Sequence, residues 1–394
     1  MPSSSPGSAT PVIVSSAAAA DAAPASLNGA HPAGYGRLAF GAVVVALGAV
    51  MLATHRAGHY WGDDFALYLR QADALLGGPD IGRVADANRF MLDNSQNPDF
   101  SPPVYPWGWP LLLAAPVAIG GLDVDALSMV TTVAMLAFLV GWYRFTRDRL
   151  PRPLALTGMV LLGLSPLYVG WTELLGSEQA FMAAVFGSFV WLDRCKHRWM
   201  STWNAPVVAG VLAAACFTVR REGLAFLAAI AAAQLVDVID MRRRPRLLAH
   251  AAAPYAAFAI AVAAVQLILP STLVPRYEGT GVGNIVRFHD TYLHAVAESF
   301  GSDSHGLGWI VVVLAVAGLA HRMVTAWRVD LPMVAYGVVV ALIGCSFHIP
   351  SSRYVATVIP IVLYGLLQLP SAVVGVVGSR ARVPVAMATA LCLT

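Results

Sequence analysis

The chain has 394 residues, of which 58% are hydrophobic and only 12% are charged, and its mean hydropathy is +0.66. This composition is typical of proteins dissolved in lipid and excludes a chain dissolved in water. The net charge of +3 does not indicate nucleic-acid binding, because most basic residues fall in short clusters between hydrophobic segments. The composition therefore predicts an all-α, polytopic membrane protein with no nucleic-acid partner.

The N-terminal segment differs from the rest of the chain. Residues 1–36 are rich in Ala, Ser, Pro and Gly and contain no Lys or Arg. They lack the basic start of a signal peptide and cannot build a hydrophobic core. We expect a disordered cytoplasmic tail, followed by one transmembrane domain over residues 37–394.

The hydrophobic segments predict about ten membrane crossings, since each crossing takes roughly 20 apolar residues. A shorter apolar piece at residues 109–120, bounded by prolines and glycines, is expected to lie at the membrane interface. The predicted spans lie near residues 37–54, 124–145, 153–170, 177–193, 204–219, 223–240, 247–269, 307–320, 331–347 and 354–369.

Basic clusters occur in every second loop between these spans, and the positive-inside rule makes those loops cytoplasmic. The N-terminus is then cytoplasmic as well. The Ala- and Arg-rich composition with a single lysine suggests a bacterial protein of the inner (plasma) membrane. The remaining loops are predicted to be extracytoplasmic: residues 55–123, 171–176, 220–222, 270–306 and 348–353.

Two adjacent carboxylates, Asp63 and Asp64, open the long first outer loop. The next residues, 65–76, have helical spacing and end at Gly77, which predicts a short helix just outside the membrane. One carboxylate is enough to cap this helix, so the other is free to act as a general base. Two adjacent carboxylates can also ligate a hard cation, but without a third fixed ligand they make a weak site, and we predict no metal or other cofactor.

A rigid segment follows in the same loop. Residues 101–110 contain four prolines and three aromatic residues. Such a segment suits the lipid–water interface, where it is either an anchor or a platform for a sugar or a lipid.

Several short motifs resemble the GT-C superfamily of membrane glycosyltransferases, in the branch of protein O-mannosyltransferases and aminoarabinose transferases. The acidic pair with Phe65-Ala66-Leu67-Tyr68, and the Pro-Pro-x-Tyr-Pro run from Pro102, carry the likeness first. The sequence departs from the pattern in having Asp-Asp rather than Asp-Glu, and Arg221 in place of a proline. Further motifs fit in the same order: Thr172-Glu173, Ser177-Glu178, Thr218-Val219-Arg220-Arg221-Glu222-Gly223-Leu224, and Ser352-Arg353-Tyr354 with Pro360.

The resemblance implies a GT-C-like helical bundle with interfacial helices in its first outer loop. It also implies transfer of a sugar, with inversion, from a polyprenyl-phosphate donor to a lipid, glycan or protein acceptor outside the cytoplasm. Asp63 matches the general base, and Asp64 is a cap, an orienting group or a substitute base. The other candidate residues are Arg353, Arg220 and Arg221 for the donor phosphate, and Glu173, Glu178, Tyr105, His348 and His59 around the sugar or acceptor.

Two other functions share these sequence features. A transporter or lipid flippase also has many spans and binds anionic lipids, but it predicts charges near the bilayer midplane. The middle of each predicted span here is almost free of ionisable residues. A ligase that joins glycan chains from a lipid carrier is not separated from a glycosyltransferase by sequence.

Overall fold

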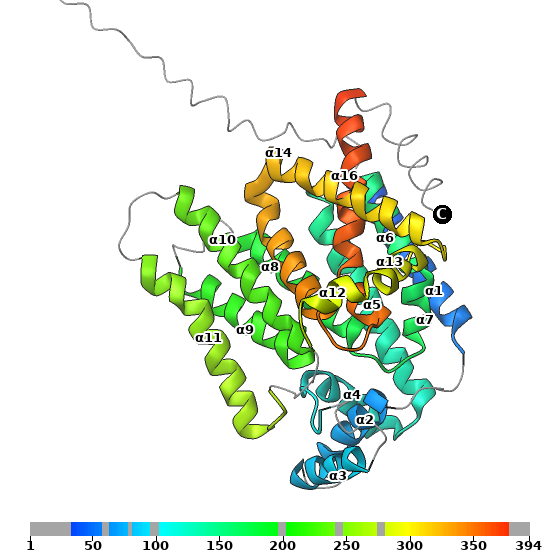
Figure 1. Cartoon of the computed structure of the whole chain (residues 1–394), viewed down its shortest axis with the longest axis vertical. Helices are drawn as coiled ribbons and strands as arrows, with labels where there is room; N and C mark the ends of the chain where they lie inside the picture. The colour runs from blue at the N-terminus through cyan, green and yellow to red at the C-terminus, as the bar shows by residue number, and fades with distance from the viewer. Residues whose placement is uncertain are drawn as a thin grey trace, which may run out of the picture.

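The computed structural model describes residues 33–56, 63–77, 81–94, 102–195, 202–240, 247–273 and 280–377. All regular structure in these ranges is helical (Figure 1). The elements are α1 Ala33–Thr54, α2 Asp63–Ala74, α3 Ile81–Asp93, α4 Gly108–Gly120, α5 Val124–Thr146, α6 Arg152–Leu164, α7 Pro166–Thr172, α8 Glu178–Cys195, α9 Asn204–Val219, the 3-10 turn η2 Arg221–Ala225, α10 Phe226–Asp240, α11 Leu247–Ile268, α12 Gly283–Arg287, α13 His289–Glu298, α14 His305–Cys345, α15 Ser352–Ala356 and α16 Ile359–Val377.

Five helical segments of the described chain are long and apolar enough to cross a membrane, and the number is six if the bent pair α6 and α7 counts as one span. Other apolar helices, including α4 and α9, are shorter. The chain is thus an all-helical polytopic membrane protein. The sequence predicts about ten spans, which is more than the five or six that meet this length and hydropathy criterion in the described chain.

The predicted continuous span at residues 153–170 is broken in the structure. Helices α6 and α7 meet at an angle of 56°. Pro166 begins α7, and the residue before it, Ser165, has an extended backbone with ψ of 126°. A residue that precedes proline is driven out of the helical region by the proline ring, so the bend is a local consequence of the sequence.

Helix α14 joins two predicted spans without a loop. Its only non-helical residue among those described is Ala326, with φ of −149° and ψ of 34°. Beyond this break, the fully buried Asp330 is paired with Arg322 at 2.6 Å and Arg149 at 3.2 Å. Figure 1 shows the two halves of α14 running in different directions. The ion pairs span the break and tie both halves of α14 to the end of α5.

A run of aromatic rings forms the centre of the bundle. Phe145 and Phe189 lie with their ring centroids 5.1 Å apart, and Phe189 lies at the same distance from Phe226. Tyr336 meets Phe189 edge to face at 5.5 Å. These rings come from α5, α8, α10 and α14, so offset and edge-to-face aromatic contacts join four helices of the core.

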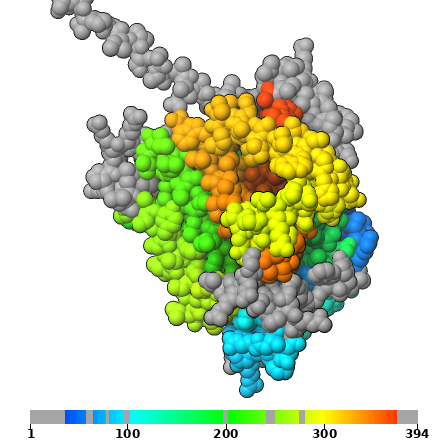
Figure 2. Space-filling view, viewed as in Figure 1, coloured from blue at the N-terminus to red at the C-terminus, as the bar shows by residue number. Residues whose placement is uncertain are grey.

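Helices α2, α3 and α4 form one end of the molecule (Figures 1 and 2). The predicted helix at 65–76 corresponds to α2, which ends at Ala74. Gly77 follows with a positive φ of +91°. The interfacial piece predicted at 109–120 corresponds to α4. Helix α3 was not predicted, although Ile81, Val84 and Ala85 have the spacing of one helical face; it lies within the long first outer loop and buries only Val84 and Asn88.

Close packing of α14 on α16 depends on two glycines. A Cβ at Gly318 would overlap the carbonyl oxygen of Gly365, whereas a Cβ at Gly187 on α8 would meet nothing within 4 Å. We expect Gly318→Ala to destabilise the protein by about 1–3 kcal/mol through overpacking. The control Gly187→Ala should be neutral or stabilising by up to about 1 kcal/mol, because alanine favours helix. Thermal unfolding in detergent measures both, and equal midpoints would contradict this packing.

Candidate active site

Five predicted site residues from distant parts of the chain meet at one place: Asp64, Tyr105, Glu178, Arg220 and Arg353. Asp64 lies in the first turn of α2, Glu178 begins α8, and Arg353 lies in α15. Tyr105 belongs to the Pro-rich segment before α4, and Arg220 lies between α9 and η2. Four of them lie in loops predicted to be extracytoplasmic, and Glu178 lies at the adjoining end of a predicted span.

Ion pairs link these residues in a row, which we call the ion network: Asp64, Arg353, Glu178, Arg220 and Glu222. Arg353 contacts an Asp64 carboxylate oxygen through Nη1 at 2.7 Å, and it donates from Nε to Glu178 Oε1 at 2.7 Å. Arg220 donates to the same Glu178 oxygen and to Glu222 Oε1, the latter at 2.8 Å. Glu178 therefore sits between two guanidinium groups.

Burial makes these pairs strong and mutually dependent. The Glu178 side chain is 2% exposed and that of Arg220 is 10% exposed, whereas that of Arg353 is 29% exposed. A buried charge is tolerated only when it is paired and hydrogen-bonded, which this arrangement provides. Arg353 is the cation of the ion network most open to an incoming group.

The Arg353 guanidinium group is positively charged. Burial alone would lower the pKa of its guanidinium, but the Glu178 and Asp64 carboxylates outweigh this and raise the pKa well above its ordinary value. The ion network contains three carboxylates and two guanidinium groups, so its formal charge is −1 when all are ionised. This is a charged, polar site beside an apolar bundle.

Two tyrosines complete the polar surroundings. Tyr105 donates its hydroxyl to Asp64 Oδ1 at 2.5 Å. The ring of Tyr68 meets the Tyr105 ring edge to face at 4.8 Å, and its hydroxyl lies 3.4 Å from Ser177 Oγ. Burial, reinforced by the negative charge of Asp64, raises the pKa of Tyr68, which therefore stays neutral.

The surrounding segments are tied together by hydrogen bonds to backbone carbonyl groups. Trp109 donates its indole N–H to Leu175 at 2.9 Å, which holds α4 on the turn before α8. Tyr168 donates its hydroxyl to Ala356 at 2.5 Å, which holds α15 on α7. Ser351 accepts from the Arg353 N–H and caps α15. These bonds fix the segments that carry Glu178 and Arg353.

The other predicted residues lie elsewhere or outside the described part. Arg221 donates to the carbonyl groups of Thr272 and Val104, and so joins the Pro-rich segment to the end of α11. Glu173 ends α7 and, among the described residues, takes part in none of the ion pairs above. The His348 ring lies tilted against the Phe347 ring, with 4.7 Å between ring centroids.

The side chains of two predicted site residues, Asp63 and His59, lie outside the described part of the structure. Asp63 begins α2, but its side chain lies outside the described atoms, as does all of His59. The described residues contain no group of three or more His, Cys, Asp or Glu that could hold a metal ion. A cation between Asp63 and Asp64 therefore stays untested.

Sequence reasoning did not select Glu222, Ser177 or Tyr68 as site residues. Glu222 follows Arg220 by two positions and accepts two hydrogen bonds from its guanidinium group. Ser177 accepts from Arg220 Nη1 at 3.2 Å. Tyr68 follows Asp64 by four positions and so lies on the same face of α2. All three lie in the same motifs as selected residues, and Tyr68 also has helical spacing from Asp64, so signals for them were present in the sequence.

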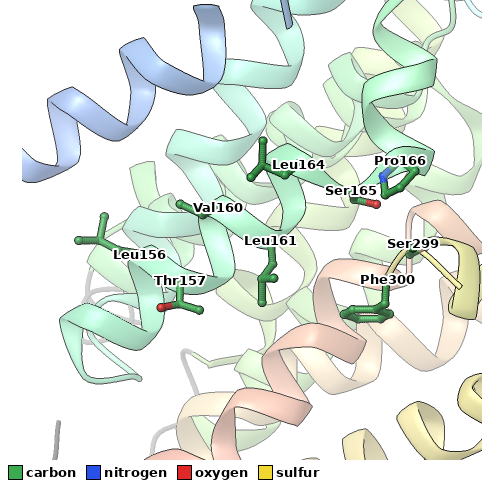
Figure 3. A pocket seen from close by; sticks show the side chains of 10 residues that line it. Leu156, Thr157, Val160, Leu161, Leu164, Ser165, Pro166, Ser299 and Phe300 are labelled. Atoms are coloured by element: carbon green, nitrogen blue, oxygen red, sulfur yellow. The ribbon is translucent and has the colours of Figure 1, made fainter. Parts of the chain in front are cut away.

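A separate apolar cavity of about 470 Å³ lies at the bend between α6 and α7 (Figure 3). Leu161, Leu164 and Phe300 are among its lining residues, and Ser165 and Pro166 mark the bend itself. None of the ion network lines it. The cavity is therefore distinct from the polar site.

No protein-family model matches the chain, and no curated protein matches it in sequence. Its function is therefore argued from its own residues.

The ion network should stabilise the fold as well as form the site. Glu178→Gln leaves two guanidinium groups without their shared carboxylate, and we expect it to lower the free energy of unfolding by about 3–5 kcal/mol. Glu173→Gln, five residues earlier, should stay within about 0.5 kcal/mol of wild type. Thermal unfolding in detergent compares them, and a Glu178→Gln protein as stable as the control would show that the pairing contributes nothing.

Proposed function

We propose that this protein is a membrane glycosyltransferase that moves a sugar from a polyprenyl-phosphate donor to a lipid, glycan or protein acceptor on the extracytoplasmic side, with inversion. The observation that carries the proposal is the convergence of Asp64, Glu178, Arg220 and Arg353 from four distant segments. Such a site offers carboxylates for proton transfer and guanidinium groups for a phosphate.

The reaction needs few groups. The acceptor oxygen or nitrogen forms a bond to the anomeric carbon, while the bond from that carbon to the donor phosphate oxygen breaks. The leaving polyprenyl phosphate keeps the electron pair and gains negative charge, and the acceptor proton passes to a carboxylate. A base and a nearby cation therefore both lower the barrier.

Arg353 is the proposed phosphate ligand. Its planar guanidinium suits two parallel hydrogen bonds to a phosphate, and it is the most exposed cation of the ion network. We expect the phosphate to exchange with Asp64 at Arg353 Nη1 because the two anions repel each other, although the guanidinium has further N–H donors. Asp64 thus controls how readily Arg353 binds the donor.

Asp63 remains the proposed general base, with Asp64 as its orienting neighbour. The described oxygens of Asp64 are already engaged, Oδ1 by Tyr105 and Oδ2 by Arg353. A carboxylate held in this way is better suited to positioning other groups than to receiving a proton. This division of roles follows from contacts of Asp64 alone.

The proposal also includes the finer topology. About ten spans, counting the two halves of α14 separately, adding α8, α9 and α16 and leaving α4 at the interface, would place the N-terminus in the cytoplasm and the ion network outside a bacterial plasma membrane. Arg149, Arg322 and Asp330 would then lie at the cytoplasmic ends of their helices. Glu178 begins α8 and Asp193 lies two residues before its end, about 22 Å further along at 1.5 Å per residue, so the two charges lie toward opposite ends of this helix.

Transfer of a radiolabelled sugar tests the reaction directly. The purified protein in lipid vesicles is given a panel of labelled polyprenyl-phosphate sugars, with membrane lipids and glycans as acceptors. Wild type should transfer label, and Asp63→Asn should lose at least about a hundredfold in rate because the base is gone. Asp73→Asn on the same helix is the matched control and should keep wild-type activity.

The outcomes separate the rival functions. Donor binding without transfer to any acceptor would contradict the proposal and favour a transporter or flippase. Transfer of whole glycan chains in place of single sugars would identify a ligase. Full activity in Asp63→Asn would move the base to another carboxylate.

Donor binding provides an independent test of the exchange at Arg353. Asp64→Asn removes the carboxylate that competes with the phosphate, so we expect it to bind polyprenyl phosphate several-fold more tightly than wild type. Arg353→Gln should bind about 10- to 100-fold more weakly, since charge-assisted hydrogen bonds contribute about 1.5–3 kcal/mol. Equilibrium binding in nanodiscs measures both. Weaker binding by Asp64→Asn would argue against the competition.

A further inference from the structure

Gln71 is a buried residue of α2 that neither the motifs nor the proposed reaction uses. Its side chain is fully buried, and it lies seven residues, or two helical turns, after Asp64. Nε2 donates to the Tyr105 carbonyl at 3.0 Å, and Oε1 accepts from the Tyr105 N–H at 2.9 Å. One side chain thus satisfies both backbone groups of Tyr105.

An amide suits this double contact. Asn and Gln present an N–H donor and a carbonyl acceptor side by side without taking up a proton, whereas a carboxyl group can do so only when it is protonated. Tyr105 lies outside the regular helices, and Pro106 next to it cannot donate a backbone hydrogen bond. Gln71 therefore takes the place that a neighbouring strand would have in a sheet.

The same face of α2 holds Tyr105 at two further points. Asp64 accepts its hydroxyl at 2.5 Å, and the Tyr68 ring packs against its ring at 4.8 Å. Residues 64, 68 and 71 follow the i, i+4, i+7 spacing of one helix face. The backbone, the ring and the hydroxyl of Tyr105 are each matched to a separate residue of this face.

We propose that Gln71 is a positioning residue: by clamping the Tyr105 backbone to α2 it aims the Tyr105 hydroxyl at Asp64, and so sets the orientation of the Asp64 carboxylate toward Arg353. The clamp itself can be tested without any reaction. Its effect on catalysis rests on the proposed glycosyltransferase function.

The chain supplies a matched control in Asn88. This second buried amide, from α3, donates to the Pro103 carbonyl at 2.8 Å. It anchors the same Pro-rich segment two residues before Tyr105. Loss of Asn88 therefore loosens the segment in general, whereas loss of Gln71 releases Tyr105 in particular.

The experiment places 3-fluorotyrosine at position 105 of the full chain in nanodiscs and records its fluorine NMR signal. Asp64→Asn defines the signal of a hydroxyl that has lost its carboxylate acceptor. Gln71→Met should move the signal toward that reference, and Asn88→Leu should leave it at the wild-type position. If Gln71→Met does not fold, Gln71→Asn, with its amide withdrawn by one methylene, carries the same expectation.

An unmoved signal in the folded Gln71 variant, or an equal movement in Asn88→Leu, would overturn the proposal. In the transfer assay, Gln71→Met should lower kcat about tenfold with little change in the donor KM, and Asn88→Leu should change neither. A wild-type protein that transfers no sugar would refute the proposed function while leaving the fluorine result to decide the role of Gln71. A moved signal with unchanged kcat would confine Gln71 to a structural role and so overturn its catalytic consequence.

Discussion

The buried carboxylate of Glu178 is the interaction on which the site depends. Arg220 and Arg353 both donate to it, and through them it is linked to Glu222 and Asp64. Because Glu178 is 2% exposed, water does not replace a lost arginine, and loss of either partner leaves a buried charge less compensated at a large cost in free energy. The charge of one glutamate therefore fixes the start of α8, the turn before η2 and helix α15 relative to each other.

A second ionic cluster organises the other end of α8. Arg149 forms a two-pronged pair with Asp193, at 2.5 and 2.7 Å, and also contacts Asp330, which is bound by Arg322 and by the Tyr364 hydroxyl. Arg149 also covers the Phe145 ring at 3.8 Å. The Arg149 side chain is only 4% exposed, and its three guanidinium nitrogens all donate to carboxylates within the protein. The contrast with the partly exposed Arg353 is what makes the Glu178 end the functional candidate.

Much of the architecture could be predicted because hydropathy and turn chemistry are local. The helical class, α2, α4 and the first span follow from apolar runs ended by glycine or polar residues. The break at Pro166 was also present in the sequence, but it was read as part of one span because the hydropathy continues across it. Helix α3 was not predicted although its apolar residues have helical spacing, because it lies within the long first outer loop.

The candidate site divides in the same way. The sequence by itself determined which residues are chemically able to act and, through the basic clusters, that Asp64, Tyr105, Glu178, Arg220 and Arg353 share one side. Only the tertiary structure decided their partners: Arg353 and Glu178 are 175 residues apart, and their contact exists because α8 and α15 are brought together by packing. The proposed role of Gln71 likewise could not be predicted from the sequence, because it depends on which backbone groups the buried amide contacts in the folded protein. Ion pairs and clamps between distant segments are properties of the packed bundle, whereas hydropathy and charge belong to each segment alone.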